Sequence, residues 1–351
     1  MPLGVYVHVP FCARRCDYCA FATWTDRHHL FDAYTSACRR EITETQLARV
    51  ASVFFGGGTP SLLPADLLCS ILAAIPRQAD AEVTVECNPE SVSAQALAAY
   101  RAAGVNRISF GAQSTAPHVL ASLGRSHRPG DLPAAVALAR DAGFTTFNVD
   151  LIFGAVGESA EDWARTLDDV VALDPPHVSA YALTVEHGTP LAADAARHPD
   201  DDDQAEKYAA ADEVLGRAGL RNYEISNWAR PGHECRHNLL YWRQGDYRGI
   251  GCAAHSHERG RRWWNVRTPE RYIAAIESGR SPIAGTEELD DDQRRLEALQ
   301  LALRTREGVP RSAIPDDPTI QRLLESDGER VHLTVEGRLL ANEVAVRLVG
   351  A

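Results

Sequence analysis

The sequence predicts an α/β protein, a partial (β/α)6 barrel followed by a small helical C-terminal domain. From residue 3 to about residue 230, short runs of β-branched residues alternate with stretches rich in Ala and Leu, without low-complexity linkers. Strands and helices that alternate at this length are typical of parallel βαβ units, and right-handed crossovers between such units give a partly closed barrel. After residue 290 the pattern changes to a helix followed by short elements.

Each expected strand of the barrel ends beside glycine, cysteine or polar residues. The strands are expected near Leu3–Val9, Ser52–Phe55, Glu82–Cys87, Arg107–Gly111, Thr145–Leu151 and His177–Leu183. In parallel sheets the functional site gathers at the carboxyl ends of the strands. The motifs that follow these strands are therefore expected to meet at one mouth of the barrel.

Three cysteines follow the first strand directly. Cys12, Cys16 and Cys19 have the spacing C-x3-C-x2-C, which puts three thiols on one tight loop. Structural zinc usually takes four ligands as two separated pairs, so zinc would need a histidine here. The candidates are His8, His28 and His29. An iron–sulfur cubane that only carries electrons also takes four cysteines. With three cysteines, one iron keeps an open position for a substrate or cofactor.

The second and third strands end in a glycine run and a carboxylate. Gly56-Gly57-Gly58 would let the backbone approach a ligand closely and adopt positive φ angles, although a simple tight turn would also explain it. Glu86 lies just before the break at Pro89, where a solvated loop carboxylate is the alternative. Two candidate contributors to a ligand site therefore lie at neighbouring strand ends.

The fourth and fifth strands add further polar groups. Gln113 and Arg125 offer an amide and a planar cation to an anionic or hydroxyl-bearing ligand. Asp150 lies within the run Asn148-Val149-Asp150-Leu151 of the fifth strand. These residues extend the expected site across the mouth of the barrel.

The three-cysteine spacing after a strand that ends in Pro10-Phe11 resembles the radical S-adenosylmethionine (SAM) superfamily. In that family a [4Fe–4S] cluster binds SAM at its open iron, and the protein positions the cofactor. Thr59-Pro60 after the glycine loop resembles the motif of the oxygen-independent coproporphyrinogen III oxidase branch. Together, the motifs resemble this branch over nearly the whole chain. The resemblance implies Cys12, Cys16 and Cys19 as cluster ligands. It implies SAM contacts from Tyr6, Gly57, Gly58, Thr59, Glu86, Gln113, Arg125 and Asp150.

Two departures from the oxidase favour the haem-chaperone (HemW) subgroup of this branch. Phe21 stands where the oxidase has a fourth cysteine, and only five residues precede Tyr6, where the oxidase has a long arm. Smaller departures from the chaperone subgroup are Ala20, where aspartate is common, and Ala155-Val156, where Leu-Pro is usual. Neither of the smaller differences falls on an expected ligand.

The segment from Tyr223 to Glu258 carries a second resemblance. His237-Asn238-x-x-Tyr241-Trp242 is similar to the H-N-x-x-Y-W signature of haem-binding members. A neutral imidazole can ligate haem iron, and aromatic side chains offer flat apolar walls to a porphyrin. His237 is therefore the expected haem ligand, with a hydrogen-bonded structural histidine as the alternative and Cys235 as a competing thiolate.

Composition limits the classes of function. The chain has 351 residues, 45% hydrophobic and 24% charged, with a net charge of −12, so no overall basic field favours nucleic acid or an anionic membrane. No apolar run approaches the roughly 18 residues of a spanning helix, and Met1-Pro2-Leu3 leaves no room for a signal peptide ahead of the first strand. Eight cysteines without paired spacing are expected to be reduced thiols in the cytoplasm. The only lysine, Lys207, follows Glu206, which excludes a Walker-type nucleotide site.

The expected domains are a barrel over 1–230, a connecting segment with the histidine motif over 231–289, and a winged-helix-like domain over 290–351. In the last, Asp290-Asp291-Asp292 is expected to start a helix through Arg294–Arg304. A winged helix suggests DNA binding, yet this segment holds nine arginines and twelve Asp and Glu residues, a net charge of −3. The electrostatic contribution that supports DNA binding is missing, which favours a packing or partner-contact domain.

The expected function is that of a haem chaperone that binds a [4Fe–4S] cluster, SAM and haem. It would pass the haem to an unidentified acceptor protein, such as a membrane-bound respiratory enzyme, without being an integral membrane protein itself. The first alternative is an enzyme, oxygen-independent coproporphyrinogen III oxidase, although that activity is expected to be absent. The second is an acidic winged-helix regulator.

Overall fold

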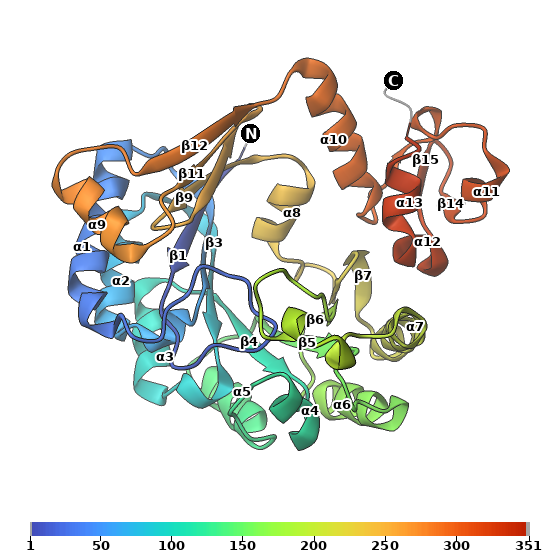
Figure 1. Ribbon diagram of the computed structural model, residues 1–351, viewed down its shortest axis with the longest axis horizontal. Coiled ribbons are helices and arrows are strands. Elements are labelled where there is room, and N and C mark those ends of the chain that lie inside the picture. The colour runs from blue at the N-terminus through green and yellow to red at the C-terminus, as the bar shows by residue number, and fades with distance from the viewer. Residues whose placement is uncertain (1, 349–351) are drawn as a thin grey trace.

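A twelve-stranded sheet is the framework of the protein, and its middle part curves into a partial barrel (Figure 1). The computed structural model describes residues 2–348. The strand order is β12-β11-β10-β9-β1-β2-β3-β4-β5-β6-β8-β7, and β1 to β6 run parallel to one another in chain order. The α/β class and the partial (β/α)6 barrel are therefore confirmed.

All six strands expected in the barrel are present, with ends that differ by a few residues. They are β1 Leu3–Val9, β2 Val50–Gly57, β3 Arg77–Cys87, β4 Arg107–Gln113, β5 Phe147–Phe153 and β6 His177–Ala182. The largest difference is the start of β3, which begins at Arg77 because that residue pairs with Val50 across a shift in register. Such a pairing depends on two distant segments and leaves no local signal in the sequence.

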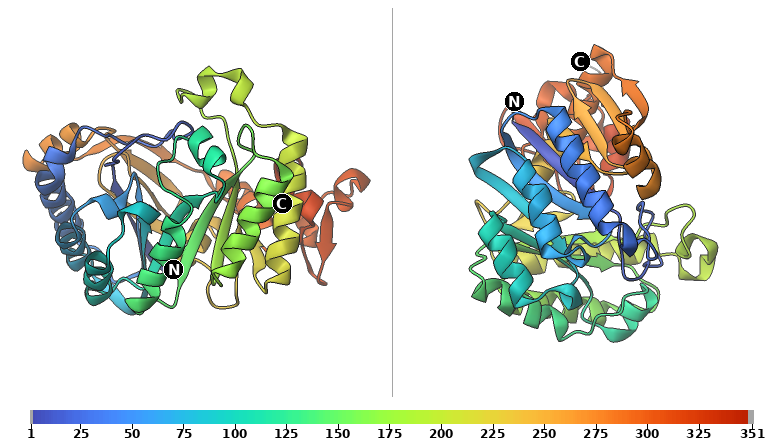
Figure 2. Two further views of the ribbon diagram at one scale, coloured as in Figure 1. Left: turned by 90° about the horizontal axis from the view of Figure 1, so that it is seen from below. Right: turned by 90° about the vertical axis from the view of Figure 1, so that its left-hand side faces the viewer.

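Helices cover the outer side of the barrel strands, and Figure 2 shows them as an arc around the sheet. They are α1 Phe31–Thr45, α2 Ala65–Ala74, α3 Ala94–Ala103, α4 Pro117–Ser122, α5 Asp131–Asp141, α6 Ala160–Ala172 and α7 Asp201–Arg217. Local sequence sets their ends: Ser159 and Asp162 form a capping box at the start of α6, and Gly104 ends α3 with a φ of 98°. Short 3₁₀ turns connect several elements: His28–Leu30, Pro60–Leu62, Pro89–Ser91, Leu191–Ala193, Ala195–Arg197 and Arg311–Ala313.

Residues 221–288 continue the sheet at both of its edges. The elements are β7 Arg221–Glu224, β8 Asn227–Ala229, α8 Arg236–Trp242, β9 Asp246–Ile250, β10 His255–Glu258, β11 Arg261–Asn265, α9 Pro269–Glu277 and β12 Ile283–Glu288. β9 pairs in parallel with β1, and β10, β11 and β12 follow in antiparallel order. Residues 231–289, which the sequence suggests to be a connecting segment, thus add four strands beyond β1 and one helix beside β2.

The C-terminal part has a hydrophobic cluster of its own. Its elements are α10 Asp291–Leu303, β13 Val309–Pro310, α11 Pro318–Gln321, β14 Leu324–Ser326, β15 Arg330–Leu333, α12 Val335–Leu339 and α13 Ala341–Ala345. The acidic start of α10 is as expected, because Asp290 and Gln293 form a capping box. Leu303, Val331 and Val344 lie in the cluster, which is separate from the barrel core. Arg338 on α12 donates to Asp212 on α7 at 2.9 Å and joins this part to the barrel.

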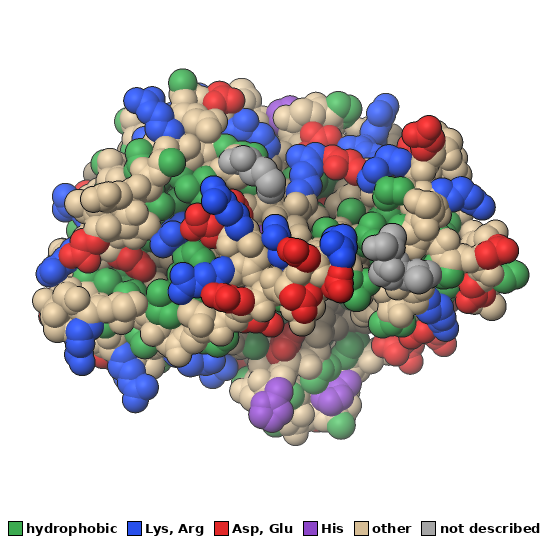
Figure 3. All heavy atoms as spheres, turned by 90° about the horizontal axis from the view of Figure 1, so that it is seen from above, with side chains coloured by type: hydrophobic (Ala, Val, Ile, Leu, Met, Phe, Trp, Pro, Cys, Tyr) green, Lys and Arg blue, Asp and Glu red, His purple; other side chains and the backbone are tan. Residues whose placement is uncertain are grey.

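Among residues 2–348, no helix has the length and apolar character needed to cross a bilayer. The face seen from above carries arginine and acidic side chains side by side, without one continuous basic area (Figure 3).

Candidate functional site

The loop that carries the three cysteines, Phe11–Phe21, is fixed at its start. Backbone bonds from Cys12 to Trp24 (3.0 Å) and from Trp24 to Pro10 (2.8 Å) close it against the chain that follows. Phe11 is fully buried and packs edge-on against Phe31 and Tyr34. The first cysteine is therefore held at the carboxyl end of β1. We call this segment the cluster loop.

The three thiols of the cluster loop lie beside polar groups from other elements. Cys12 is buried, whereas Cys16 and Cys19 are partly exposed. The Thr59 hydroxyl donates to the Cys12 sulfur at 3.8 Å, and Arg125 Nη1 donates to the Cys16 sulfur at 3.6 Å. Burial raises the pKa of the Cys12 and Cys19 thiols, so bound cations would be needed to favour their thiolate forms. Hydrogen bonds to the sulfurs are a feature of iron–sulfur sites.

Within residues 2–348, no three Cys, His, Asp or Glu side chains converge on a point that would hold a single metal ion. A cubane makes a different demand, because each thiolate binds a different iron at a different corner of the cluster. Three thiols spread over one loop match that requirement, and the donor set fits a [4Fe–4S] cluster with three protein ligands.

The glycine loop after β2 packs directly on the cluster loop. Gly58 N–H donates to the carbonyl of Val9 at 2.8 Å, and Thr59 N–H donates to that of Phe11 at 2.8 Å. A Cβ on Gly58 would lie 2.6 Å from the Phe11 oxygen and 3.0 Å from the Cys12 sulfur. Gly57 has a φ of 111°, and a Cβ there would lie 2.4 Å from the His8 ring. Close approach and backbone conformation therefore require glycine at both positions.

Two partly buried carboxylates lie near the end of β3 and within β5. Gly57 N–H donates to Glu86 Oε2 at 3.3 Å, and burial, followed by the Asp150 charge, raises the pKa of Glu86 to about 8. Asp150 accepts from the Ser109 hydroxyl and from Asn148 Nδ2, both at 2.8 Å. Burial also raises the pKa of Asp150. A cationic ligand between them would stabilise both charged forms, and SAM carries a sulfonium and an ammonium group.

Arg125 and Gln113 are the remaining polar residues that the sequence predicts near Glu86 and Asp150. Arg125 Nη2 donates to the Gly111 carbonyl at 2.8 Å and to Asn88 Oδ1 at 2.9 Å, while its Nε is buried without a partner among residues 2–348. Gln113 has a φ of 66° at the point where the pairing of β4 with β5 shifts register. The structure thus gathers residues that lie far apart in the sequence.

His237 lies near the start of α8, which packs against β2, and is separate from the other residues of the expected site. Its side chain is fully buried, Nδ1 shares a hydrogen bond with the Ser52 hydroxyl at 2.8 Å, and Nε2 shares one with the Tyr241 hydroxyl at 2.8 Å. The ring stacks on Phe54 with centroids 5.4 Å apart, and burial lowers the pKa of His237 to about 3. Both nitrogens are occupied, so an iron could reach this imidazole only after one of these bonds breaks. Cys235 is buried as well, and its thiol donates to Glu82 at 3.5 Å.

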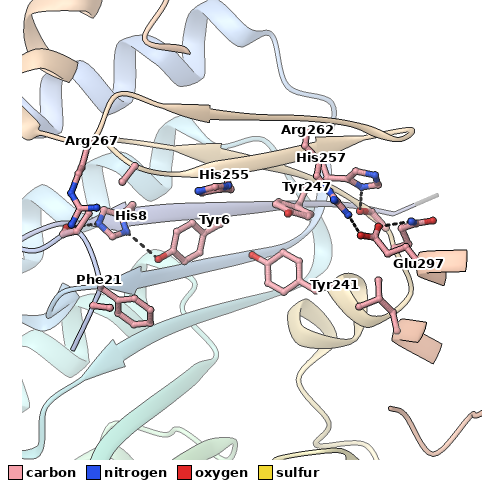
Figure 4. Close-up of a pocket in the computed structure, with 16 residues that line it drawn as sticks. Tyr6, His8, Phe21, Tyr241, Tyr247, His255, His257, Arg262, Arg267 and Glu297 are labelled. Atoms are coloured by element: carbon pink, nitrogen blue, oxygen red, sulfur yellow. Dashed lines mark hydrogen bonds and ion pairs between the residues drawn. The ribbon is translucent and has the colours of Figure 1, made fainter. Parts of the chain in front are cut away.

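A cavity of about 680 Å³ opens between the cluster loop, β1, β9, β10 and α8 (Figure 4). Its lining includes Tyr6, Phe21, Tyr241, Tyr247 and His255. This is within the range of about 300–1,000 Å³ typical of small-molecule sites. The sequence analysis singles out Tyr6 but not Tyr247, His255 or Arg267, which also line the cavity. Only the position of His255 directly after Gly249-Ile250-Gly251-Cys252-Ala253-Ala254 could have drawn attention to it.

Comparison with known proteins agrees with the fold and with the resemblance to the radical SAM superfamily. Residues 6–170 match the Radical SAM superfamily. The chain is 43% identical over 371 aligned positions to the heme chaperone HemW of Mycobacterium tuberculosis H37Rv, covering 99% of this chain and 95% of that protein. It is 32% identical to HemW of Bacillus subtilis, covering 99% of both.

The solved structure of coproporphyrinogen III oxidase (HemN) from Escherichia coli, described as a radical SAM enzyme, superposes with a TM-score of 0.84. The identity is 23%, and the alignment covers 98% of this chain and 89% of that one. This likeness shows the fold. The identities to HemW over nearly full length show more, and the chain belongs to the HemW heme-chaperone family of the radical SAM superfamily.

Proposed function

We propose that this protein is a haem chaperone that holds a [4Fe–4S] cluster and SAM, binds haem beside them, and delivers the haem to an acceptor protein. The observation that carries the proposal is the cavity of about 680 Å³ beside the cluster loop. It places aromatic walls suited to a porphyrin next to a loop whose three thiols suit a cubane.

The cluster ligands we propose are Cys12, Cys16 and Cys19. When bound, the cluster supplies an open iron that holds SAM and one electron for SAM chemistry. Arg125 would hold the Cys16 sulfur by its hydrogen bond of 3.6 Å. Thr59 would do the same for Cys12, at 3.8 Å.

For SAM, the proposed contacts lie on β1 to β5 and on the loops that follow these strands. The Gly57–Thr59 backbone and Glu86 would bind the amino group, and Asp150 would bind the ribose hydroxyls. The remaining proposed contacts are Tyr6, Gln113 and Arg125. Glu86 is largely protonated before a cation arrives, because its pKa is about 8. A bound cation would lower that pKa, so Glu86 would lose its proton as the site fills.

Haem is proposed to bind near His237, on the side of the cavity formed by Tyr241. His237 contributes through the hydrogen bond that fixes Tyr241. The haem acceptor is proposed to be a separate protein that meets this one at the cavity mouth, in the cytoplasm. The C-terminal part is proposed to serve as a packing or partner-contact domain, because its net charge of −3 gives no electrostatic support to DNA binding.

A haem titration and an oxidase assay on one anaerobically reconstituted preparation test the proposal. We expect stoichiometric haem binding, together with no sustained conversion of coproporphyrinogen III to protoporphyrinogen IX when SAM and a reductant are present. Sustained conversion would assign the protein to the oxidase class instead. Salt-sensitive, sequence-selective binding to duplex DNA would favour the regulator.

A further inference from the structure

We propose that His255 supplies the axial ligand to haem iron in the cavity beside the cluster loop, and that His237 is a positioning residue for the cavity wall. This inference rests on the proposed haem-chaperone function. It assigns the iron to a side chain outside the H-N-x-x-Y-W motif. Figure 4 shows His255 above Tyr6, between Arg267 and Tyr247.

The other histidines on or behind the cavity wall already use both ring nitrogens. His8 bonds the Ala22 carbonyl at 2.9 Å and the Tyr6 hydroxyl at 3.2 Å. His257 donates to the Gly245 carbonyl at 2.9 Å and accepts from Gly260 N–H at 3.0 Å. His237 is bonded to Ser52 and Tyr241, as described above. An iron at any of them would have to displace an existing hydrogen bond.

His255 is different because its imidazole is exposed to the cavity and forms no hydrogen bond with any of residues 2–348. Its ring stacks on Trp264 of the neighbouring strand, with centroids 5.7 Å apart and an interplanar angle of 25°, and this contact restricts its orientation. Partial desolvation by the neighbouring side chains lowers the pKa of His255, which favours the neutral imidazole that ligates iron. A free, oriented and neutral imidazole is what a five-coordinate haem requires.

The walls around His255 suit a flat apolar ring. Phe21 is 63% exposed although it is a large apolar side chain, and it lines the cavity from the cluster loop. Tyr241 and Tyr247 pack edge to face at 4.6 Å on the opposite wall. A porphyrin between these walls would cover Phe21 and remove its apolar surface from water.

An arginine side chain that could bind the haem propionates, Arg267, also belongs to the wall of the cavity. Arg267 lines it, is exposed, and forms no side-chain hydrogen bond or ion pair with any of residues 2–348. Arg262, the other arginine of the lining, is already paired with Glu287 and Glu297. Arg267 is therefore the side chain left to bind a carboxylate.

The place of His237 follows from its hydrogen bonds. Its Nε2 holds the Tyr241 hydroxyl, and its Nδ1 is held by Ser52 on β2. Glu82 on β3 accepts from the His237 backbone N–H at 2.9 Å and fixes the start of α8. The histidine of the motif thus sets the position of a cavity tyrosine from behind.

The test is a haem titration of the full-length, cluster-reconstituted protein and of its His255→Ala, His237→Ala and Arg267→Ala variants. Each is followed by absorbance and electron paramagnetic resonance, with cluster content as the control for folding. We expect His255→Ala to lower haem affinity at least about tenfold and to change the spin-state signature, with added imidazole restoring the wild-type spectrum. His237→Ala should keep the wild-type ligand signature while binding less tightly. Arg267→Ala should weaken haem and leave the affinity for a haem dimethyl ester unchanged.

Wild-type affinity and spectrum in His255→Ala, together with loss of the ligand signature in His237→Ala, would overturn the inference while the chaperone proposal stands. Failure of the wild-type protein to bind haem would instead overturn the proposed function. If His255→Ala lost its cluster, His255→Gln, which keeps a polar side chain of similar size, would be measured in its place with the same expected outcome.

Discussion

The imidazole of His237 and the hydroxyl of Tyr241 share a hydrogen bond of 2.8 Å across one turn of α8, and the tyrosine faces the cavity while the histidine is fully buried. The sequence suggests His237 as the haem ligand, whereas its hydrogen bonds favour the supporting role that we propose for it behind Tyr241. The ligand role and the supporting role of His237 predict different effects when the hydroxyl of Tyr241 is removed, so an experiment can distinguish them.

Replacing Tyr241 with Phe should destabilise the protein by about 1–2 kcal/mol, because it leaves a fully buried His237 nitrogen without its partner. Chemical denaturation measures the change. Tyr247→Phe is the matched control, since Tyr247 lines the same cavity but its hydroxyl has no hydrogen-bond partner in the described chain. Equal losses of stability in both variants would show that the hydrogen bond between His237 and Tyr241 does not have this supporting role.

Replacing Cys16 with Ser should abolish the cubane, because one of the three thiolate ligands is lost. Iron and acid-labile sulfide analysis after anaerobic reconstitution measures this. Cys69→Ser is the control, since Cys69 is also partly exposed but lies on α2, outside the cluster loop. Full cluster content in Cys16→Ser would show that the ligands lie elsewhere.

Glu86 should make the stability of the SAM-free apoprotein fall as pH rises from about 4.5 to about 8. Its pKa is about 8 in the folded protein against an ordinary 4.5, so the folded state binds the extra proton in this window. The unfolded state loses that proton first, and the cost of burying the charged form is fully present only above the folded pKa.

Denaturation at a series of pH values should therefore show a smaller decline in Glu86→Gln than in the wild type, by a few kcal/mol at most. Glu213→Gln, which alters an exposed side chain on α7, should follow the wild-type curve. Superimposable curves for wild type and Glu86→Gln would show that Glu86 is solvated.

Lys207 should be a strong contributor to stability. Its ammonium lies 3.2 Å from Glu158 and 2.7 Å from Asp203, and the Glu158 side chain is fully buried. Lys207→Met would leave that carboxylate without its cation, at a cost of about 3–5 kcal/mol. Arg217→Ala, which breaks an exposed pair with Glu213, should cost about 0–1 kcal/mol in the same denaturation experiment. A loss of stability below about 1 kcal/mol in Lys207→Met would contradict this contribution of Lys207 to stability.

Much of the barrel could be predicted from the sequence, because each strand is a short apolar run with its own flanking signals. The predicted strand Leu3–Val9 matches β1 to the residue, and the cysteine spacing predicts the cluster loop. The extension of the sheet by β9 to β12 could not be predicted, since Gly4 pairs with Tyr247 and no local pattern encodes that contact.

The same reason explains the environment of His237. Its partners Ser52 and Glu82 lie in β2 and β3, more than 150 positions earlier in the chain. A histidine beside Asn and Trp reads the same in sequence whether its nitrogens are free or bonded. The environment of His255 could not be predicted either, because it depends on the pairing of β10 with β11, which stacks the imidazole on Trp264.

The central claim is that three cysteines hold a cubane next to a haem site. The most direct measurement is the metal and haem content of one anaerobic preparation supplied with iron, sulfide and haem. The account predicts about four irons and four sulfides per chain in addition to stoichiometric haem. A colourless protein that carries zinc and retains no haem would contradict it.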